Sequence, residues 1–212
     1  MNRTLCLLGS TSVALALGMT ALTGTAHAST TAPNCKQAAK WYDAVPWDRT
    51  TGSLPFAANY GISQAVHCLI DAERAKVGLP PLTRNTKLDV AAAEHVRAAV
   101  NLKWWGRGAD SHTNPKTGST PKSRILGAGY CPKGRSWSVS ETTYTGWGGK
   151  GTPRAAVHWW VYVSKDGHRE ILLSKSLKEI GTFGVLGGAA DRSGATARNA
   201  GSYVATFGTC TQ

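Results

Sequence analysis

The stretch DGHREILLSKSLKEIGTFGV, Asp166–Val185, combines a polar turn with the start of a buried strand. Its second half leads into β-branched and aromatic residues that predict a strand over Ile180–Leu186. Its first half places His168 between Gly167 and Arg169, where the chain enters a run of apolar residues. A titratable ring at the edge of the core indicates a half-buried polar site.

The rest of the chain surrounds this strand with helices. Apolar spacing and capping residues predict four helices, and two further segments have the β-branched character of strands. Their order favours an α+β fold in which helices pack on both faces of a small, mainly antiparallel sheet. The predicted helices are Ile62–Val77, Lys87–Leu102, Pro121–Leu126 and Thr152–Val163, and the predicted strands are Val139–Tyr144, Ile180–Leu186 and Tyr203–Phe207.

The N-terminal end predicts export. Residues 1–28 have the pattern of a secretory signal peptide, with Arg3 at the start, a weakly apolar stretch and small residues at Ala26 and Ala28. Residues 29–61 form a lead-in with little periodic signal, and residues 62–212 form the main domain. No later stretch is apolar for long enough to cross a bilayer. We therefore expect a secreted, extracellular protein without a transmembrane segment, and a monomer.

The cysteines agree with export. Cys6 leaves with the predicted signal peptide, and an even number in an exported chain predicts two disulfides with three possible connectivities. We favour Cys35–Cys68 and Cys131–Cys210, because the first pair is close in sequence and would clip the lead-in to the first helix. No C-x-x-C occurs, and four paired cysteines would leave no thiolate nucleophile.

The chain is strongly basic. It has 24 Lys and Arg against 12 Asp and Glu, a formal net charge of +12. An exported basic protein meets anionic cell-wall polymers and anionic lipid headgroups, which are the partners we consider. The alternative is that the charge serves solubility alone. Nucleic acid is not expected, because the basic residues are scattered.

Standard hydrolase motifs are absent from the sequence. Neither H-E-x-x-H nor G-x-S-x-G occurs. Three of the five histidines after residue 28 lie within predicted helices, two as surface or core-edge residues and His158 as a packing residue beside Trp159-Trp160. His112 and His168 lie in polar turns rich in Gly or Pro, and only the fold could unite them. The three helical histidines are His67, His95 and His158.

From about Ala65 to Phe207 the chain resembles the CAP superfamily, the cysteine-rich secretory, antigen 5 and pathogenesis-related proteins that share the SCP domain. The resemblance is closest to the bacterial branch. Motifs occur in the family's order: AERAKVGLPPL, DSHTNPKTGSTPKSRILGAGY, TPRAAVHWW, GHREILLSKSLKEIG and YVATFG. It implies a three-layer α–β–α sandwich with a central cleft that holds two histidines and usually two acidic residues.

The resemblance assigns this cleft to three residues. His112 in SHT and His168 in GHR match the family's two histidines, and Glu141 in SET stands where the family has GEN. The second acid would follow Trp160, where this chain has Val161-Tyr162-Val163. The interval from Trp160 to His168 is also about two residues longer than the usual bacterial pattern.

The chemistry of the trio suits a metal. Two neutral imidazoles and a carboxylate resemble an open site for zinc or another divalent metal, with one position left for water. The alternative is a hydrogen-bonded polar cluster that fixes loop geometry. Trp137, Tyr144 and Trp147 flank Glu141 and could stack on sugars or accept acyl chains, although each one singly also suits a core or rim position.

The sequence and the resemblance leave three functions to compare. We favour a secreted protein that binds a divalent metal and a lipid-like or cell-wall ligand in its cleft, and we expect binding rather than catalysis. The first alternative is a metal-dependent, peptidase-like hydrolase in which His112 and His168 hold the ion and Glu141 activates water. The second is a disulfide-stabilised extracellular scaffold with a vestigial cleft.

Overall fold

A four-stranded sheet forms the middle layer of the protein in this computed structural model, which describes residues 33–44, 56–192 and 198–211. The strand order is β1-β3-β4-β2, with β1 parallel to β3 and the other pairs antiparallel. The prediction of a small, mainly antiparallel sheet is therefore confirmed. The strands are β1 Thr83–Arg84, β2 Ser136–Gly146, β3 Glu179–Leu186 and β4 Gly201–Thr211.

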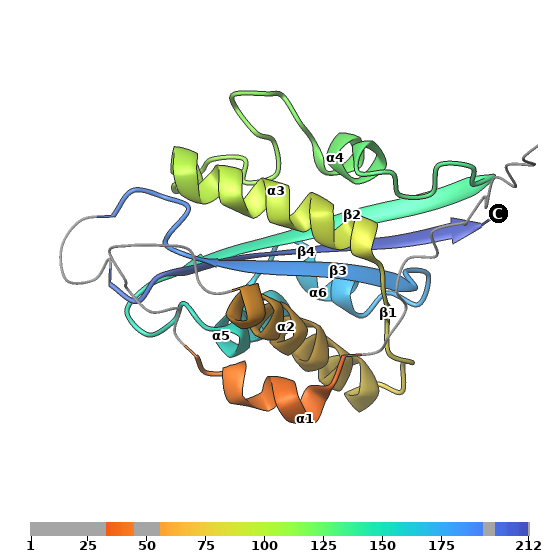
Figure 1. Ribbon diagram of the computed structural model, residues 1–212, viewed down its shortest axis with the longest axis horizontal. Helices are drawn as coiled ribbons and strands as arrows, with labels where there is room; N and C mark the ends of the chain where they lie inside the picture. Colours follow the sequence, from red (N-terminus) through yellow and green to blue (C-terminus); the bar gives the residue numbers. More distant parts are fainter. Residues whose placement is uncertain (1–32, 45–55, 193–197, 212) are drawn as a thin grey trace, which may run out of the picture.

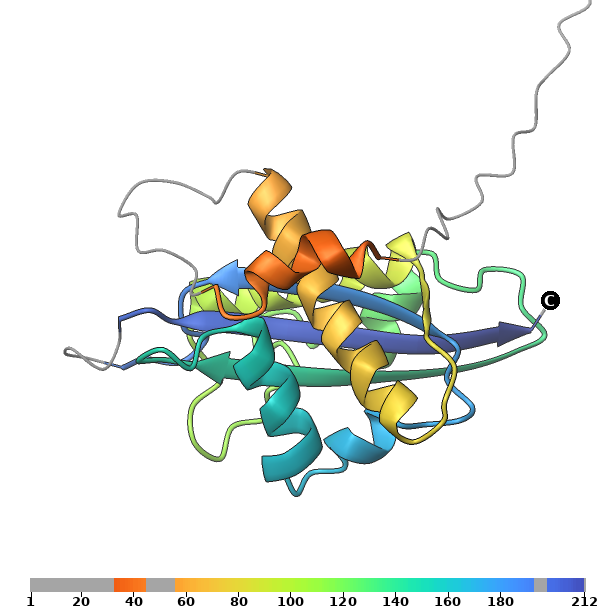
Figure 2. The same cartoon turned by 90° about the horizontal axis from the view of Figure 1, so that it is seen from below.

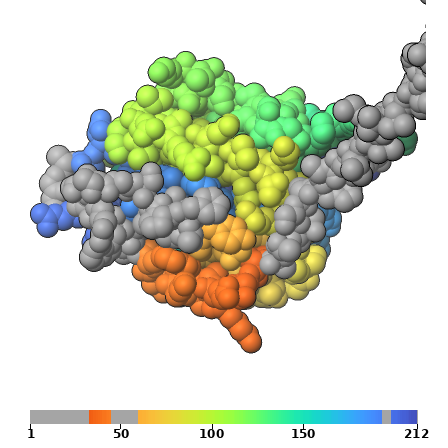
Figure 3. Space-filling view, viewed as in Figure 1, coloured from red at the N-terminus to blue at the C-terminus, as the bar shows by residue number. Residues whose placement is uncertain are grey.

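Helices cover both faces of the sheet, which confirms the predicted three-layer α–β–α arrangement (Figures 1 and 2). One layer holds α3 and α4, and the other holds α1, α2, α5 and α6. In the space-filling view α1 lies at the lower rim of the molecule, and α3 lies in the upper half below the green chain that follows it (Figure 3). The helices are α1 Cys35–Ala38, α2 Phe56–Lys76, α3 Thr86–Leu102, α4 Pro121–Gly127, α5 Pro153–His158 and α6 His168–Leu172, with a 3₁₀ turn η1 Ala39–Trp41 and a π-helix η2 Trp159–Val163.

Local sequence signals explain where α3 and α4, the two helices of one layer, begin. The Asn85 side chain caps α3 by accepting from the Lys87 amide at 2.9 Å. Thr120 caps α4 in a reciprocal capping box with Ser123, and Pro121 follows at the first helical position. Both starts agree with the sequence prediction. The helix α4 also carries Arg124, a residue of the candidate site.

The first long helix starts earlier than predicted. It begins at Phe56 rather than Ile62, so Gly61 lies inside α2. A Cβ at Gly61 would stand 2.2 Å from the Trp41 indole nitrogen, so the glycine lets the ring of η1 pack against the helix. The predicted lead-in therefore contributes α1, η1 and the first turn of α2 to this layer.

The sequence prediction for His168 was incomplete. The residue lies at the start of the short helix α6, after Gly167 in the left-handed region at φ 77°, and β3 begins only at Glu179. The predicted helix through Val163 ends in the π-helix η2, where the Ser164 amide donates to the Trp159 carbonyl five residues earlier at 2.8 Å. A π-turn takes up additional chain, which suits the long interval before His168.

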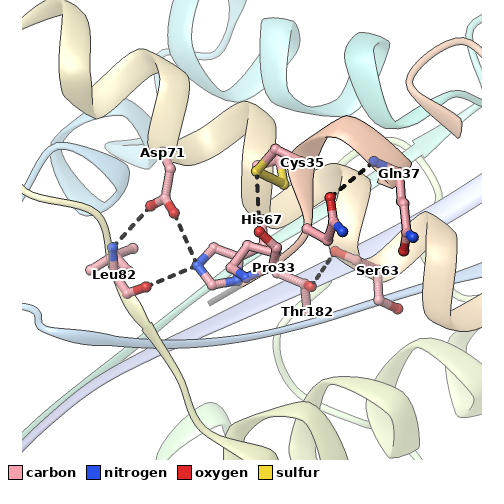
Figure 4. The surroundings of a disulfide bond; sticks show 10 residues. Pro33, Cys35, Gln37, Ser63, His67, Asp71, Leu82 and Thr182 are labelled. Atoms are coloured by element: carbon pink, nitrogen blue, oxygen red, sulfur yellow. Dashed lines mark hydrogen bonds and ion pairs between the residues drawn. A yellow bond between two sulfur atoms is a disulfide. The ribbon is translucent and has the colours of Figure 1, made fainter. Parts of the chain in front are cut away.

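Both favoured disulfides form. Cys35–Cys68 clips α1 to α2, and Cys131–Cys210 joins the segment before β2 to the end of β4. Beside the first disulfide, the His67 ring lies buried with Nε2 at 3.0 Å from the Leu82 carbonyl, and Asp71 accepts from the Leu82 amide (Figure 4). This histidine ties α2 to the chain that leads into β1, which is a structural role.

The predicted signal peptide, residues 1–28, lies outside the described residues, and it stays a prediction. Among the residues that the structure does describe, no helix has the length and apolar character needed to cross a membrane.

Candidate functional site: a histidine cleft at the edge of the sheet

Glu141 is the centre of a buried ion pair on β2. Its side chain has no exposed surface, and its Oε2 accepts from Nη1 of Arg124 on α4 at 2.7 Å. The same guanidinium donates through Nη2 to the carbonyls of Ser119 and His112. Arg124 thus neutralises the carboxylate and fastens the loop before α4 to it. Sequence reasoning missed this role, because an arginine in a short polar helix usually faces solvent.

His112 lies on that loop and contacts Glu141 directly. Its Nδ1 is 2.9 Å from Glu141 Oε1, and about a third of the side chain is exposed. A ring nitrogen that donates to a carboxylate fixes the tautomer, which leaves Nε2 as the acceptor or ligand atom. Glu141 therefore orients His112, and both of its oxygens are occupied.

His168 approaches His112 from the opposite layer. The two ring centroids are 6.4 Å apart, although one ring comes from the loop after α3 and the other from α6 below the sheet. His168 is buried, and its Nδ1 is 2.7 Å from Ser164 Oγ. The Trp159 ring covers it at 5.3 Å. The histidines thus meet beside Glu141 on β2, which is an edge strand of the sheet.

A third histidine lies beneath this pair. His95 lies on the apolar stripe of α3, and its Nε2 donates to the Ser111 carbonyl at 2.8 Å and lies 3.7 Å from Glu141 Oε1. Its position on the apolar stripe was a usable signal, since a polar residue there must find a buried partner. Burial lowers the pKa of His95 despite the nearby carboxylate, and burial also lowers the pKa of His168, with His112 adding to the effect.

The two histidines offer two of the ligands that a metal site needs. The Nδ1 atoms of His112 and His168 are hydrogen-bonded, so their Nε2 atoms are the ligands that this arrangement offers. Within the described ranges, no group of three or more His, Cys, Asp or Glu side chains is arranged to hold an ion. Two imidazoles oriented by outer partners fit a site completed by water or by a ligand, and Glu141 fits the outer shell.

An open cleft of about 370 Å³ adjoins the histidines. Its walls come from the loop after α3, from the outer edge of β2 and from η2, and they include Ser111, Tyr144 and Trp159. Burial raises the pKa of Tyr144 to about 12, so this phenol stays protonated, and it donates to the Lys150 carbonyl at 2.7 Å. Neither histidine lines the cleft itself, but two of its wall residues are next to them: Ser111 precedes His112 in the chain, and the Trp159 ring packs against His168.

The three aromatic residues that the sequence placed beside Glu141 lie in different surroundings. Tyr144 lines the cleft, whereas Trp137 lies four residues before Glu141 on β2, 38% exposed, with the Lys122 ammonium over its ring. Trp147 packs beside Gly188 under the Arg192 guanidinium. Neither tryptophan lines the cleft. Trp105 and Trp159 line the cleft instead.

Comparison with known proteins agrees with this geometry. The sequence profile of the cysteine-rich secretory protein family, CAP, matches residues 68–204, well over half of the 212 residues. The chain matches none of the curated proteins at a significant level.

Two solved structures share the fold. One is an outer surface protein from Borrelia burgdorferi, with 20% sequence identity and a TM-score of 0.50 over 76% of this chain and 98% of that chain. Another is an extracellular protein containing an SCP domain from Bacillus anthracis, with 17% identity and a TM-score of 0.50 over 76% of this chain and 45% of that chain. This chain thus spans less than half of the Bacillus protein. Together with the sequence match, the shared fold shows that the chain belongs to the cysteine-rich secretory protein (CAP) family.

Proposed function

We propose that this chain is an extracellular binding protein that holds a divalent metal, with zinc as the first candidate, between His112 and His168. The bound metal would meet a lipid-like or cell-wall ligand in the adjoining cleft. The proposal depends on one observation: two imidazoles from opposite layers lie 6.4 Å apart, each with Nδ1 already hydrogen-bonded. Rings held in this way offer their Nε2 atoms to an ion.

The surrounding residues support metal binding by controlling the state of each ring. Glu141, fixed by Arg124, holds the Nδ1 proton of His112, and Ser164 holds Nδ1 of His168. The lowered pKa of His168 keeps that ring neutral near pH 7, the form that binds a metal. A bound divalent ion would supply a positive centre for an oxygen atom of the ligand.

The location outside the cell has independent support. The N-terminal pattern predicts export, the two disulfides suit an oxidising compartment, and the two fold relatives are named as an outer surface protein and an extracellular protein. The net charge of +12 would favour anionic polymers of a cell surface as partners over long distances.

The geometry favours binding over hydrolysis. A metal-dependent hydrolase needs a base that can take a proton from water, and both carboxylate oxygens of Glu141 are occupied by Arg124 and His112. We therefore rank the hydrolase second and the vestigial scaffold third.

Zinc titration by isothermal calorimetry tests the proposal on protein purified from culture medium. We expect one ion per chain, and we expect His112→Ala with His168→Ala to weaken binding at least about 100-fold. His158→Ala, at an exposed histidine of α5, is the matched control and should bind as the wild type does. Unchanged affinity in the double variant would exclude this metal site, and zinc-dependent cleavage of a peptide or ester library would favour the hydrolase instead.

A further inference from the structure

We propose that the cleft beside His168 is a subsite for a neutral saccharide. The inference rests on the proposed function only in naming the class of cell-wall ligand that would lie next to the histidine pair. The subsite itself is built by residues that take no part in holding a metal. It can therefore be tested separately.

Aromatic faces form the apolar part of the subsite. The Trp159 ring lies 5.8 Å from the Tyr144 ring, and Trp105, from the loop after α3, also lines the cleft. Trp159 is partly exposed and stays in place because His168 packs against it at 5.3 Å. Rings that are fixed at the wall of an open cleft offer stacking surface to the C–H face of a sugar at little entropic cost.

Polar groups alternate with these rings. Ser111 Oγ and Thr143 Oγ1 are hydrogen-bonded to each other at 2.8 Å on the cleft wall, and hydroxyl pairs of this kind can also accept from or donate to a ligand hydroxyl. Trp105 is only 7% exposed, and in the described part of the chain its indole N–H finds no acceptor. That nitrogen has almost no exposed surface, so Trp105 contributes its ring rather than its N–H to the cleft wall.

The mixture of groups selects among ligand classes. An acyl chain prefers a continuous apolar lining, which the hydroxyls of Ser111 and Thr143 interrupt. An anionic group would find no Lys or Arg among the residues that line the cleft, where the charged side chain is the carboxylate of Asp166. A volume of about 370 Å³ lies within the range of small-molecule sites. A neutral or N-acetylated sugar matches all three features.

Gly106 provides a way to block the subsite without touching its contacts. It lines the cleft, and a Cβ built there has no atom within 4 Å, so Gly106→Phe would place a ring in open space. Gly127, at the end of α4, also has no atom within 4 Å of a built Cβ and does not line the cleft. Gly127→Phe is therefore the matched control.

The experiment titrates the full secreted chain with the trimer of N-acetylglucosamine, followed by calorimetry and by tryptophan fluorescence, with and without zinc. We expect saturable binding to the wild type and to Gly127→Phe. Gly106→Phe should lower affinity at least about tenfold, and Trp159→Ala should lower it about five- to tenfold, as expected for one lost stacking contact. Trp159→Phe, which keeps a ring, should recover most of the affinity.

The outcomes separate the two proposals. If Gly106→Phe binds the trimer as tightly as the wild type, or if palmitate displaces the trimer or binds in its place, the saccharide subsite is overturned. If the wild type binds zinc but no trimer, the subsite fails and the metal site stands. Trimer binding that persists when no zinc binds anywhere on the chain would keep the subsite and reject the metal site.

Discussion

At the scale of single residues, the cleft depends on one buried charge pair. Arg124 and Glu141 are almost fully buried, so each charge has lost its water and relies on the other. The guanidinium also reaches two loop carbonyls, which couples the charge pair to the position of His112. An exposed ion pair in the same protein, Arg154 with Asp43, offers a direct comparison, since both partners stay more than half exposed.

Arg124→Met should therefore destabilise the protein strongly. It leaves the Glu141 carboxylate buried with only histidine partners, and breaking a buried pair in this way costs about 3–5 kcal/mol. Urea unfolding followed by circular dichroism measures the loss. Arg154→Met is the matched control and should cost no more than about 1 kcal/mol. Equal losses in the two variants would show that Arg124 does not support the cleft, and Arg124→Met with Glu141→Leu should recover much of the stability.

At the scale of elements, α3 rests directly on the backbone of β3. A Cβ at Gly181 would stand 2.1 Å from the Asp89 amide nitrogen and 2.1 Å from the Leu88 carbonyl carbon, so the first turn of α3 occupies the space of a side chain. The Asp89 side chain accepts from the Thr182 amide at 3.0 Å, and Thr206 donates to the Leu88 carbonyl at 2.9 Å. The spacing between helix and sheet is thus set by a glycine.

Gly181→Ala should cost about 3 kcal/mol or more, at the upper end of overpacking, because rigid backbone rather than a side chain must move. Gly127→Ala, where a Cβ meets open space, should change the free energy of unfolding by less than about 1 kcal/mol. Thermal unfolding of the two variants beside the wild type compares them. A Gly181→Ala protein as stable as the wild type would mean that α3 can shift freely on the sheet.

The regular elements could be predicted because their signals are local. Apolar periodicity and caps located α3, α4, β3 and β4 to within a few residues. The two-residue strand β1, the five-residue helix α6 and the π-helix η2 were missed, since each is too short for a periodic pattern and depends on contacts with distant chain. His112 and His168 were found through motif order, whereas Arg124 and Trp159 acquire their roles only when separate layers meet.

At the scale of the whole molecule, burial of histidines should make stability depend on pH. Burial lowers the pKa of His95 and of His168 below the ordinary 6.5. Between each lowered value and 6.5 the unfolded chain binds more protons than the folded chain does. The free energy of unfolding therefore rises with pH in this window, levels off above it and is lost as the pH falls. Asp89 acts in the opposite sense near its ordinary 3.8, because burial raises its pKa.

Urea unfolding between about pH 5 and pH 7.5 should show this loss, since the lowered pKa values of Asp43, Glu73 and Asp110 keep those three carboxyl groups ionised in this range. Two buried histidines together contribute a slope of up to about 2.7 kcal/mol per pH unit where both are protonated only in the unfolded chain. His95→Gln should reduce that slope by about half, because the glutamine cannot take up a proton on unfolding. His158→Gln, at an exposed histidine, should keep the wild-type slope. If stability instead rises as the pH falls from 7.5 to 5, the folded protein accommodates charged histidines, and the neutral rings required for a metal site are absent from the cleft.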